Sequence, residues 1–220
     1  MSARLPRSGL VPTAGMVPAE IGRNRRALAG ILLTGGASSR MGRDKALLRI
    51  AGEPNARRIA TLLSRVAHPV VEVGPAVSGL ASVREEPRGG GPLVAVACGG
   101  RALRALGHAG AALVLACDLP FVEEAVLRFL AARPGTGSVV PTVEGRAQPL
   151  CARWSAVDLA VAGALAAAGA RALRALPWDA ATDRPDESAW SAVTSARSFA
   201  DVDSPEDLVR LGINWREAFE

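Results

Sequence analysis

Short apolar runs alternate with helix-like segments along most of this chain. Runs of about four to eight apolar residues are typical of buried strands, whereas apolar residues three and four positions apart are typical of helices. The apolar runs predict strands or shorter extended pieces at Ala27–Thr34, Ala46–Ile50, Pro69–Val73, Ala81–Arg84, Ala111–Cys117, Ser138–Val143 and Gln148–Trp154. Helices are predicted over Pro54–Val66, Leu93–Leu106 and Val122–Ala132, followed by two that begin at Ser155 and Ser204.

The two C-terminal helices begin with capping signals. Ser155 has Asp158 at the N3 position, as in a capping box, and Ser204 is followed directly by Pro205 and two acids. Between these helices, residues 177–195 show no clear period, and we predict an irregular segment there.

Strands that alternate with helices indicate an α/β fold. We expect a three-layer, doubly wound, mostly parallel and Rossmann-like sheet with helices on both faces. Ligands of such sheets bind beyond the carboxyl ends of the strands. Glycine-rich or acidic loops begin at Gly35, at Glu86 and at Asp118, each after a predicted strand. We therefore expect the three loops to meet at one edge of the sheet.

One domain over residues 28–220 is the expected organisation. The chain has 220 residues and is 49% hydrophobic, which is sufficient for a sizeable core. Proline and glycine interrupt residues 1–27 and leave no apolar period there. We expect a disordered or non-native N-terminal tail over this stretch, with Met16 as an alternative start.

Composition argues against nucleic-acid and membrane partners. The net charge is +5, but residues 1–28 hold five arginines against one acid, so the remainder is close to neutral. Aromatic residues make up only 4% and tyrosine is absent, which disfavours stacking platforms for bases. No run of about eighteen apolar residues predicts a membrane span.

The cysteines and histidines do not suggest a metal centre. Cys98, Cys117 and Cys151 lie far apart in apolar segments, without metal or disulfide spacing. Two histidines are too few for a histidine-based site. Reduced thiols in a cytoplasmic protein are therefore expected.

The stretch from Leu32 to Leu48 is the first candidate site. A short apolar run leads into Gly35 and Gly36, and Arg40, Arg43 and Lys45 follow within the next few positions. Glycine turns and clustered cations present N–H groups and positive charge to phosphates. The stretch matches neither Walker A nor G-x-G-x-x-G. A turn with solvated cations is the alternative.

Two acids extend this candidate site. Asp118 ends the most hydrophobic predicted strand and suits Mg²⁺, which proteins hold with one or two carboxylates together with substrate phosphates. A helix cap is the alternative role for Asp118. Glu86 precedes three glycines and could face the metal or a sugar, or be a solvated loop acid. Arg40 and Lys45 would neutralise a triphosphate and the developing pyrophosphate charge.

With these motifs in place, the chain resembles the MobA-like nucleotidyltransferases. Leu33 to Leu48 is similar to the family form L-A-G-G-x-S-x-R-M-G-x-D-K, with Thr34 in place of the alanine. Four further stretches agree with the family in order and spacing: Arg84–Leu93, Cys117–Pro120, Gly145–Leu150 and Phe199–Leu208. The resemblance covers about residues 28–211.

The best-known members of this family are molybdenum cofactor guanylyltransferases. The resemblance implies transfer of GMP from GTP to the terminal phosphate of molybdopterin-bound cofactor, with Mg²⁺ as cofactor and release of pyrophosphate. Maturation proteins of molybdoenzymes are a further implied partner. The implied nucleotide-binding residues are Leu33, Thr34, Gly35, Gly36, Lys45, Glu86 and Asp118. The implied catalytic residues are Arg40, Lys45 and Asp118, with Asp118 also as the metal ligand.

The chain departs from the family pattern at several positions. Glu86 stands where the family has aspartate, although Glu85 could take that place instead. Gly74 replaces an asparagine that some members use after the second strand. Asp201 and Asp203 stand where asparagines are common, near the pterin side.

Two other functions stay open at this point. One is the same chemistry on another substrate, either cytidylyl transfer to the cofactor or nucleotidyl transfer to a sugar or alcohol phosphate. The other is a nucleotide-binding partner without catalysis, which the presence of both Lys45 and Asp118 disfavours.

Overall fold

A computed structural model describes residues 28–35, 47–178 and 180–219. The expected tail over residues 1–27 lies outside this part of the chain. The central feature is a five-stranded sheet in the order β5-β4-β1-β6-β9. Its strands are β1 (Ala29–Leu33), β4 (Val70–Val73), β5 (Ala81–Val83), β6 (Ala112–Ala116) and β9 (Cys151–Trp154). All neighbouring pairs are parallel except β6 with β9, so the prediction of a mostly parallel sheet is confirmed.

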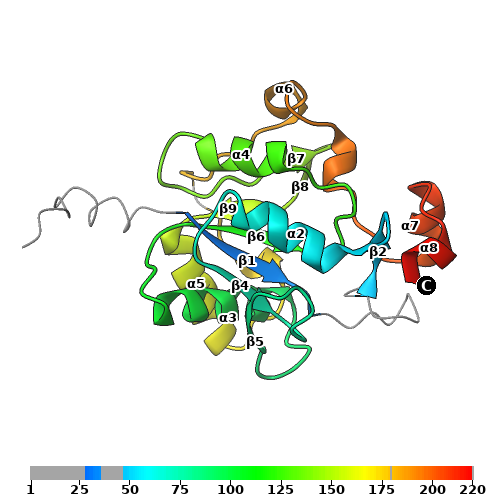
Figure 1. The fold of residues 1–220 in the computed structure, drawn as a ribbon. Helices are drawn as coiled ribbons and strands as arrows, with labels where there is room; N and C mark the ends of the chain where they lie inside the picture. The colour runs from blue at the N-terminus through cyan, green and yellow to red at the C-terminus, as the bar shows by residue number, and fades with distance from the viewer. Residues whose placement is uncertain (1–27, 36–46, 179, 220) are drawn as a thin grey trace, which may run out of the picture.

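Helices cover both faces of the sheet (Figure 1). Helices α2 (Asn55–Ser64) and α4 (Glu124–Ala132) lie on one face, and α3 (Pro92–Ala105) and α5 (Ala156–Ala167) lie on the other. Every residue of β1 and β6 is buried, because both faces of these central strands are covered. The predicted three-layer α/β fold is therefore confirmed.

Shorter elements complete the described chain. They are β2 (Arg49–Ile50), β3 (Glu53–Pro54), β7 (Thr142–Val143), β8 (Arg146–Ala147), η2 (Leu173–Ala175), α6 (Glu187–Trp190), η3 (Ala196–Phe199), α7 (Pro205–Arg210) and α8 (Trp215–Phe219). Helices α7 and α8 lie beside β2 (Figure 1), and they form a separate small core with Leu48. The Ser204 capping box is present, with Asp207 at N3. No helix among the described residues is long and apolar enough to cross a membrane.

Two predictions about local structure were wrong in part. The strand predicted at Ser138–Val143 shrinks to β7, because the N–H groups of Val140 and Thr142 donate to the backbone around Asp183 instead of to a long ladder. Pro141 also has no N–H to offer. The segment predicted to be irregular contains α6, which Asp186 caps by accepting from the Ser188 N–H.

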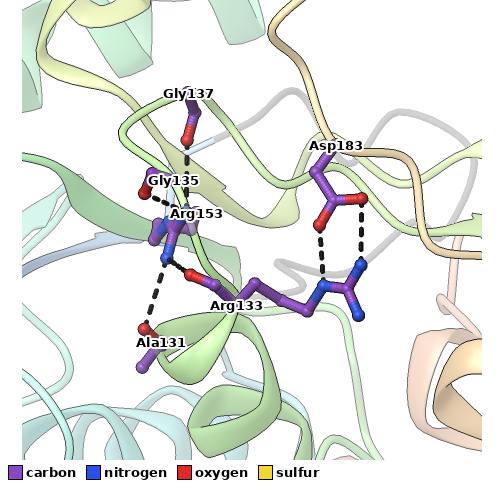
Figure 2. A network of polar contacts seen from close by, with 6 residues as sticks. All are labelled: Ala131, Arg133, Gly135, Gly137, Arg153 and Asp183. Atoms are coloured by element: carbon purple, nitrogen blue, oxygen red, sulfur yellow. Dashed lines mark hydrogen bonds and ion pairs between the residues drawn. The ribbon is translucent and has the colours of Figure 1, made fainter.

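A buried arginine connects β9 to the end of α4. Arg153 is 6% exposed, and its guanidinium donates to the carbonyls of Ala131, Arg133, Gly135 and Gly137 (Figure 2). Arg133 in turn forms a bidentate ion pair with Asp183. Because Arg153 pairs with Leu113 near the amino end of β6, this network lies away from the carboxyl edge of the sheet. It stabilises the fold and holds the segment around Asp183 against the chain between α4 and β7.

We predict opposite effects of alanine at two adjacent glycines of α3. A Cβ on Gly99 would lie 2.5 Å from Cγ2 of Ile31, whereas a Cβ on Gly100 would make an ordinary contact 3.7 Å from Leu159. Gly99→Ala should lower the free energy of unfolding by about 1–3 kcal/mol, because β1 is tightly packed. Gly100→Ala should leave it unchanged or raise it by up to about 1 kcal/mol. Urea unfolding of both variants measures these changes. Equal changes in the free energy of unfolding would contradict the tighter packing at Gly99.

Candidate functional site

The strands that precede the three predicted loops end at one edge of the sheet. The Cys117 N–H donates to the Leu33 carbonyl at 2.9 Å, which places the end of β6 beside the end of β1. The Gly74 N–H donates to the Val83 carbonyl at 2.9 Å, which places the end of β4 beside the end of β5. The loop that continues from Gly35 enters residues 36–46, which lie outside the described residues. The predicted roles of Gly36, Arg40 and Lys45 therefore stay predictions.

The first residues after β1 are held within the sheet. The N–H groups of Thr34 and Gly35 both donate to the Val73 carbonyl, at 3.0 and 3.2 Å. The Leu33 carbonyl accepts from Cys117. These backbone groups were predicted to hold a nucleotide, and that contact stays a prediction. Their hydrogen bonds within the sheet fix where the glycine loop begins.

A buried carboxylate lies beside Thr34, the first residue after β1. Glu72 is fully buried in β4, and its Oε1 accepts from the Thr34 hydroxyl at 2.5 Å and from the N–H groups of Ala76 and Val77 at 2.9 and 3.0 Å. Its Oε2 accepts from both the N–H and the hydroxyl of Ser78. Burial alone would raise the pKa of the Glu72 carboxyl, but the hydrogen bonds from Ser78, Thr34 and the backbone outweigh it and hold the pKa below its usual range.

Thr34 and Gly74 face each other directly. A Cβ on Gly74 would lie 2.0 Å from Thr34 Oγ1 and 2.7 Å from the Gly35 nitrogen, and its φ of +154° is one that side chains rarely adopt. No side chain fits there without moving the backbone. The asparagine that some MobA-like proteins have after the second strand is therefore incompatible with this arrangement.

The structure places Glu85, rather than Glu86, next to the loop after β1. Glu85 is half-buried, and its Oε1 accepts from the Gly89 N–H at 3.0 Å. The same oxygen lies 3.7 Å from where a Cβ on Gly35 would sit. Glu86 is exposed and precedes a cis Pro87. Of the two neighbouring acids, Glu85 has the geometry of a site residue.

Asp118 is half-buried in the turn that follows β6. Its carbonyl accepts from the Val202 N–H at 3.0 Å, so Asp201 and Asp203 lie on the segment docked beside it. Within the described residues, no group of three or more His, Cys, Asp or Glu side chains is arranged around one point. The Asp118 carboxylate at a strand end is a ligand of the kind that Mg²⁺ takes together with substrate phosphates.

A polar cavity of about 390 Å³ opens beside the Asp118 turn. Its lining includes Arg58, Phe121, Glu123, Arg197 and Ser198. The Arg197 guanidinium lies over the Phe121 ring, with its carbon 3.8 Å from the ring centroid. The cavity wall therefore carries two arginines, an acid and hydroxyl groups, and Pro120 brings it to within two positions of Asp118 in the sequence.

The sequence analysis did not identify Glu72, or Arg58 beside the turn that follows β6, as residues of the candidate site. A single acid in the centre of the valine-rich strand Val70–Val73 was the available signal for Glu72, because unpaired acids are rarely fully buried. Arg58 gave no comparable signal, since arginine on a helix is usually solvated.

Comparisons with known proteins identify relatives of this chain. The family model described as MobA-like NTP transferase domain matches residues 30–183. A probable molybdenum cofactor guanylyltransferase from Opitutus terrae is 43% identical over 149 residues, which cover 63% of this chain and 72% of that protein. The molybdenum cofactor guanylyltransferase of Rhodobacter capsulatus is 31% identical over 197 residues, 86% of this chain and 97% of its own length.

A solved structure shows the same fold. The molybdopterin-guanine dinucleotide biosynthesis protein A from Archaeoglobus fulgidus superposes with a TM-score of 0.68 and 20% sequence identity. The match covers 84% of this chain and 96% of that protein. At this level of identity the likeness extends to the fold.

We predict that Glu72→Gln destabilises the protein in a pH-dependent manner. An amide nitrogen cannot accept the hydrogen bonds that one carboxylate oxygen now receives, so the free energy of unfolding should fall by about 1–3 kcal/mol at pH 7. The folded-state pKa of Glu72 is lowered, so its stabilisation is complete above the unfolded pKa of about 4.3 and is lost as the pH falls through the folded value.

Urea unfolding of both proteins between pH 7 and pH 3 measures this difference. The difference in free energy of unfolding between wild type and Glu72→Gln should be constant near neutral pH and should become smaller in acid. Glu206→Gln, at an exposed acid of α7, is the matched control and should change stability by less than about 0.5 kcal/mol. A difference in free energy of unfolding that grows in acid would contradict the stabilising role of the Glu72 carboxylate.

Proposed function

Because this chain belongs to the MobA-like NTP transferase family, we propose that it transfers GMP from GTP to the terminal phosphate of molybdopterin-type molybdenum cofactor and releases pyrophosphate. The relatives named molybdenum cofactor guanylyltransferase support this choice of substrates. The observation that carries the proposal is the position of Asp118. Its strand end is hydrogen-bonded to the strand end that precedes Gly35, so Asp118 and the first residue of the predicted phosphate-binding loop follow neighbouring strands.

We assign the binding roles as follows. Leu33, Thr34, Gly35 and Gly36 would line the nucleotide. Arg40 and Lys45 would neutralise its phosphates, and these two roles rest on the sequence motif alone. Glu86 was the acid expected on the sugar or metal side, and the placement of Glu85 beside Gly35 favours Glu85 for that role.

Mg²⁺ is the cofactor that this donor set suits. Asp118 would hold it, together with oxygens of the substrate phosphates. When bound, the ion would offset negative charge on the reacting phosphates.

The reaction needs positioning more than it needs a protein nucleophile. An oxygen of the acceptor's terminal phosphate attacks the α-phosphorus of GTP and forms a new P–O–P bond. The bond between the α-phosphorus and the oxygen bridging to the β-phosphate breaks, and pyrophosphate leaves with the electron pair. Cations that face the leaving group accelerate this step, because charge accumulates there in the transition state.

We also propose a cytoplasmic location and a later handover of the product to maturation proteins of molybdoenzymes. Cys98 and Cys151 are present as thiols, the form that a reducing compartment maintains. Burial raises the pKa of Cys98 and raises that of Cys151 to about 12. Thiols protected in this way have little reactive thiolate. The handover follows from the chemistry, because a cofactor finished as a dinucleotide has to reach the enzyme that uses it.

Pyrophosphate release from the purified protein tests the proposed function. We expect release with GTP, Mg²⁺ and molybdenum cofactor together, and little with ATP, CTP or UTP. Asp118→Ala should reduce turnover by about 100-fold or more, whereas Glu206→Ala on the exposed side of α7 should not change it. Preference for CTP, or turnover without molybdenum cofactor, would contradict the proposal.

A further inference from the structure

The first turn of α2 lies between the two halves of the proposed site. Asn55 is fully buried there. Its backbone N–H donates to the Leu48 carbonyl at 2.7 Å, and its side-chain Nδ2 donates to the Cys117 carbonyl at 2.8 Å. Leu48 ends the stretch that contains the glycine loop, and Cys117 directly precedes Asp118. One residue therefore connects the exit of the loop to the approach to the carboxylate.

Arg58 extends this connection along the Asp118 turn. Its Nη1 donates to the Val122 carbonyl at 2.9 Å, and its Nη2 donates to the carbonyls of Leu119 and Pro120 at 3.1 and 2.9 Å. Its Nε donates to Asn55 Oδ1 at 2.9 Å, which fixes the orientation of the asparagine. A planar guanidinium directs its donors in fixed directions, so carbonyls held by one fork cannot shift independently.

The Asn55 side chain does not cap α2. Asn55 is the first residue of this helix, and its N-cap, Pro54, makes no side-chain hydrogen bond. Burying an amide is costly unless its hydrogen bonds are made. Within the described residues every buried side-chain nitrogen and oxygen has a partner, so the cost is met here by contacts with Cys117 and Arg58. The contact with Arg58 is made within the first turn of α2, and the contact with Cys117 reaches out of the helix to the residue before Asp118.

Asp118 depends on this support because it lies in a turn. The Val202 N–H holds its carbonyl from one side, and the Asn55 and Arg58 donors hold the carbonyls before and after it. A metal-binding carboxylate must be placed to within about 0.5 Å, and neighbouring hydrogen bonds provide that precision. We propose that Asn55 and Arg58 are positioning residues that orient Asp118 toward the metal–nucleotide complex, an inference that rests on the proposed role of Asp118.

Asn55→Asp is the sharpest test of this role. The variant keeps the size and can still accept from Arg58, but it places a carboxylate oxygen where Nδ2 now donates to Cys117. We expect a 10- to 100-fold loss of kcat, in line with typical changes next to metal ligands, and a higher Mg²⁺ concentration for half-maximal turnover. The KM for molybdenum cofactor should not change.

Binding provides a readout that does not require turnover. Calorimetric titration of GTP in the presence of Mg²⁺ should show a clearly raised Kd for Asn55→Asp. Arg58→Gln should behave similarly, and Arg58→Lys should fail to restore binding, because an ammonium group lacks the fork. Thermal unfolding of each variant separates these effects from loss of folded protein, and the Arg58 variants decide the question if Asn55→Asp does not fold.

Arg65→Gln is the matched control. Arg65 lies at the carboxyl end of α2, opposite the end that carries Asn55, and it pairs with Glu124 of α4 at 3.3 Å through a largely exposed side chain. Its Mg²⁺ response and its affinity for GTP with Mg²⁺ should equal those of wild type.

The outcomes separate the two proposals. A wild-type protein that binds GTP with Mg²⁺ but does not turn it over with molybdenum cofactor would overturn the proposed function, while the binding comparison would still decide the positioning role. Folded Asn55→Asp and Arg58→Gln variants with wild-type affinity and Mg²⁺ response would overturn the positioning role. Absence of Mg²⁺-dependent GTP binding by the wild type would overturn both.

Discussion

Parallel pairing on both sides of β1 is the constraint on which the site depends. With β4 on one side and β6 on the other, the carboxyl end of β1 is fixed by hydrogen bonds from two directions. Parallel strands bring their carboxyl ends to one edge, so Thr34 and Gly35 after β1 lie on the same edge as the turn after β6. Covering helices on both faces leave this edge as the natural place for a ligand.

Polar groups inside the protein then fix the loops, which apolar packing cannot do alone. Glu72 gathers the turn after β4 around its two oxygens and reaches Thr34 at the start of the glycine loop. Asn55 and Arg58 do the same for the turn that carries Asp118. In each case a side chain from a regular element holds backbone groups of an irregular one. Regular elements are rigid, so the site takes its precision from them.

The sequence predicted those parts whose causes are local. The apolar runs at β1 and β6, the cap at Ser204 and the alternation of strands and helices all follow from neighbouring residues, and the structure confirms them. The sequence also predicted that the ends of these strands lie at one edge of the sheet, because this follows from parallel pairing.

The acid within the valine-rich strand marked Glu72 as unusual, but its hydrogen bond with Thr34 depends on the pairing of β1 with β4 and could not be predicted. Asn55 carried no such mark, because the Cys117 carbonyl that it bonds lies 62 positions further along the chain. Glu85 and Glu86 are neighbours, and only the path of the chain decides which one approaches Gly35.

The contact between Thr34 and Gly74 limits how this protein can diverge. Because a hydroxyl, a backbone nitrogen and an unusual φ all exclude a side chain at position 74, no single substitution can introduce one there. Replacing Thr34 by a smaller residue would remove only one of the three obstacles. A related protein with an asparagine at this point must therefore route its chain differently after β4.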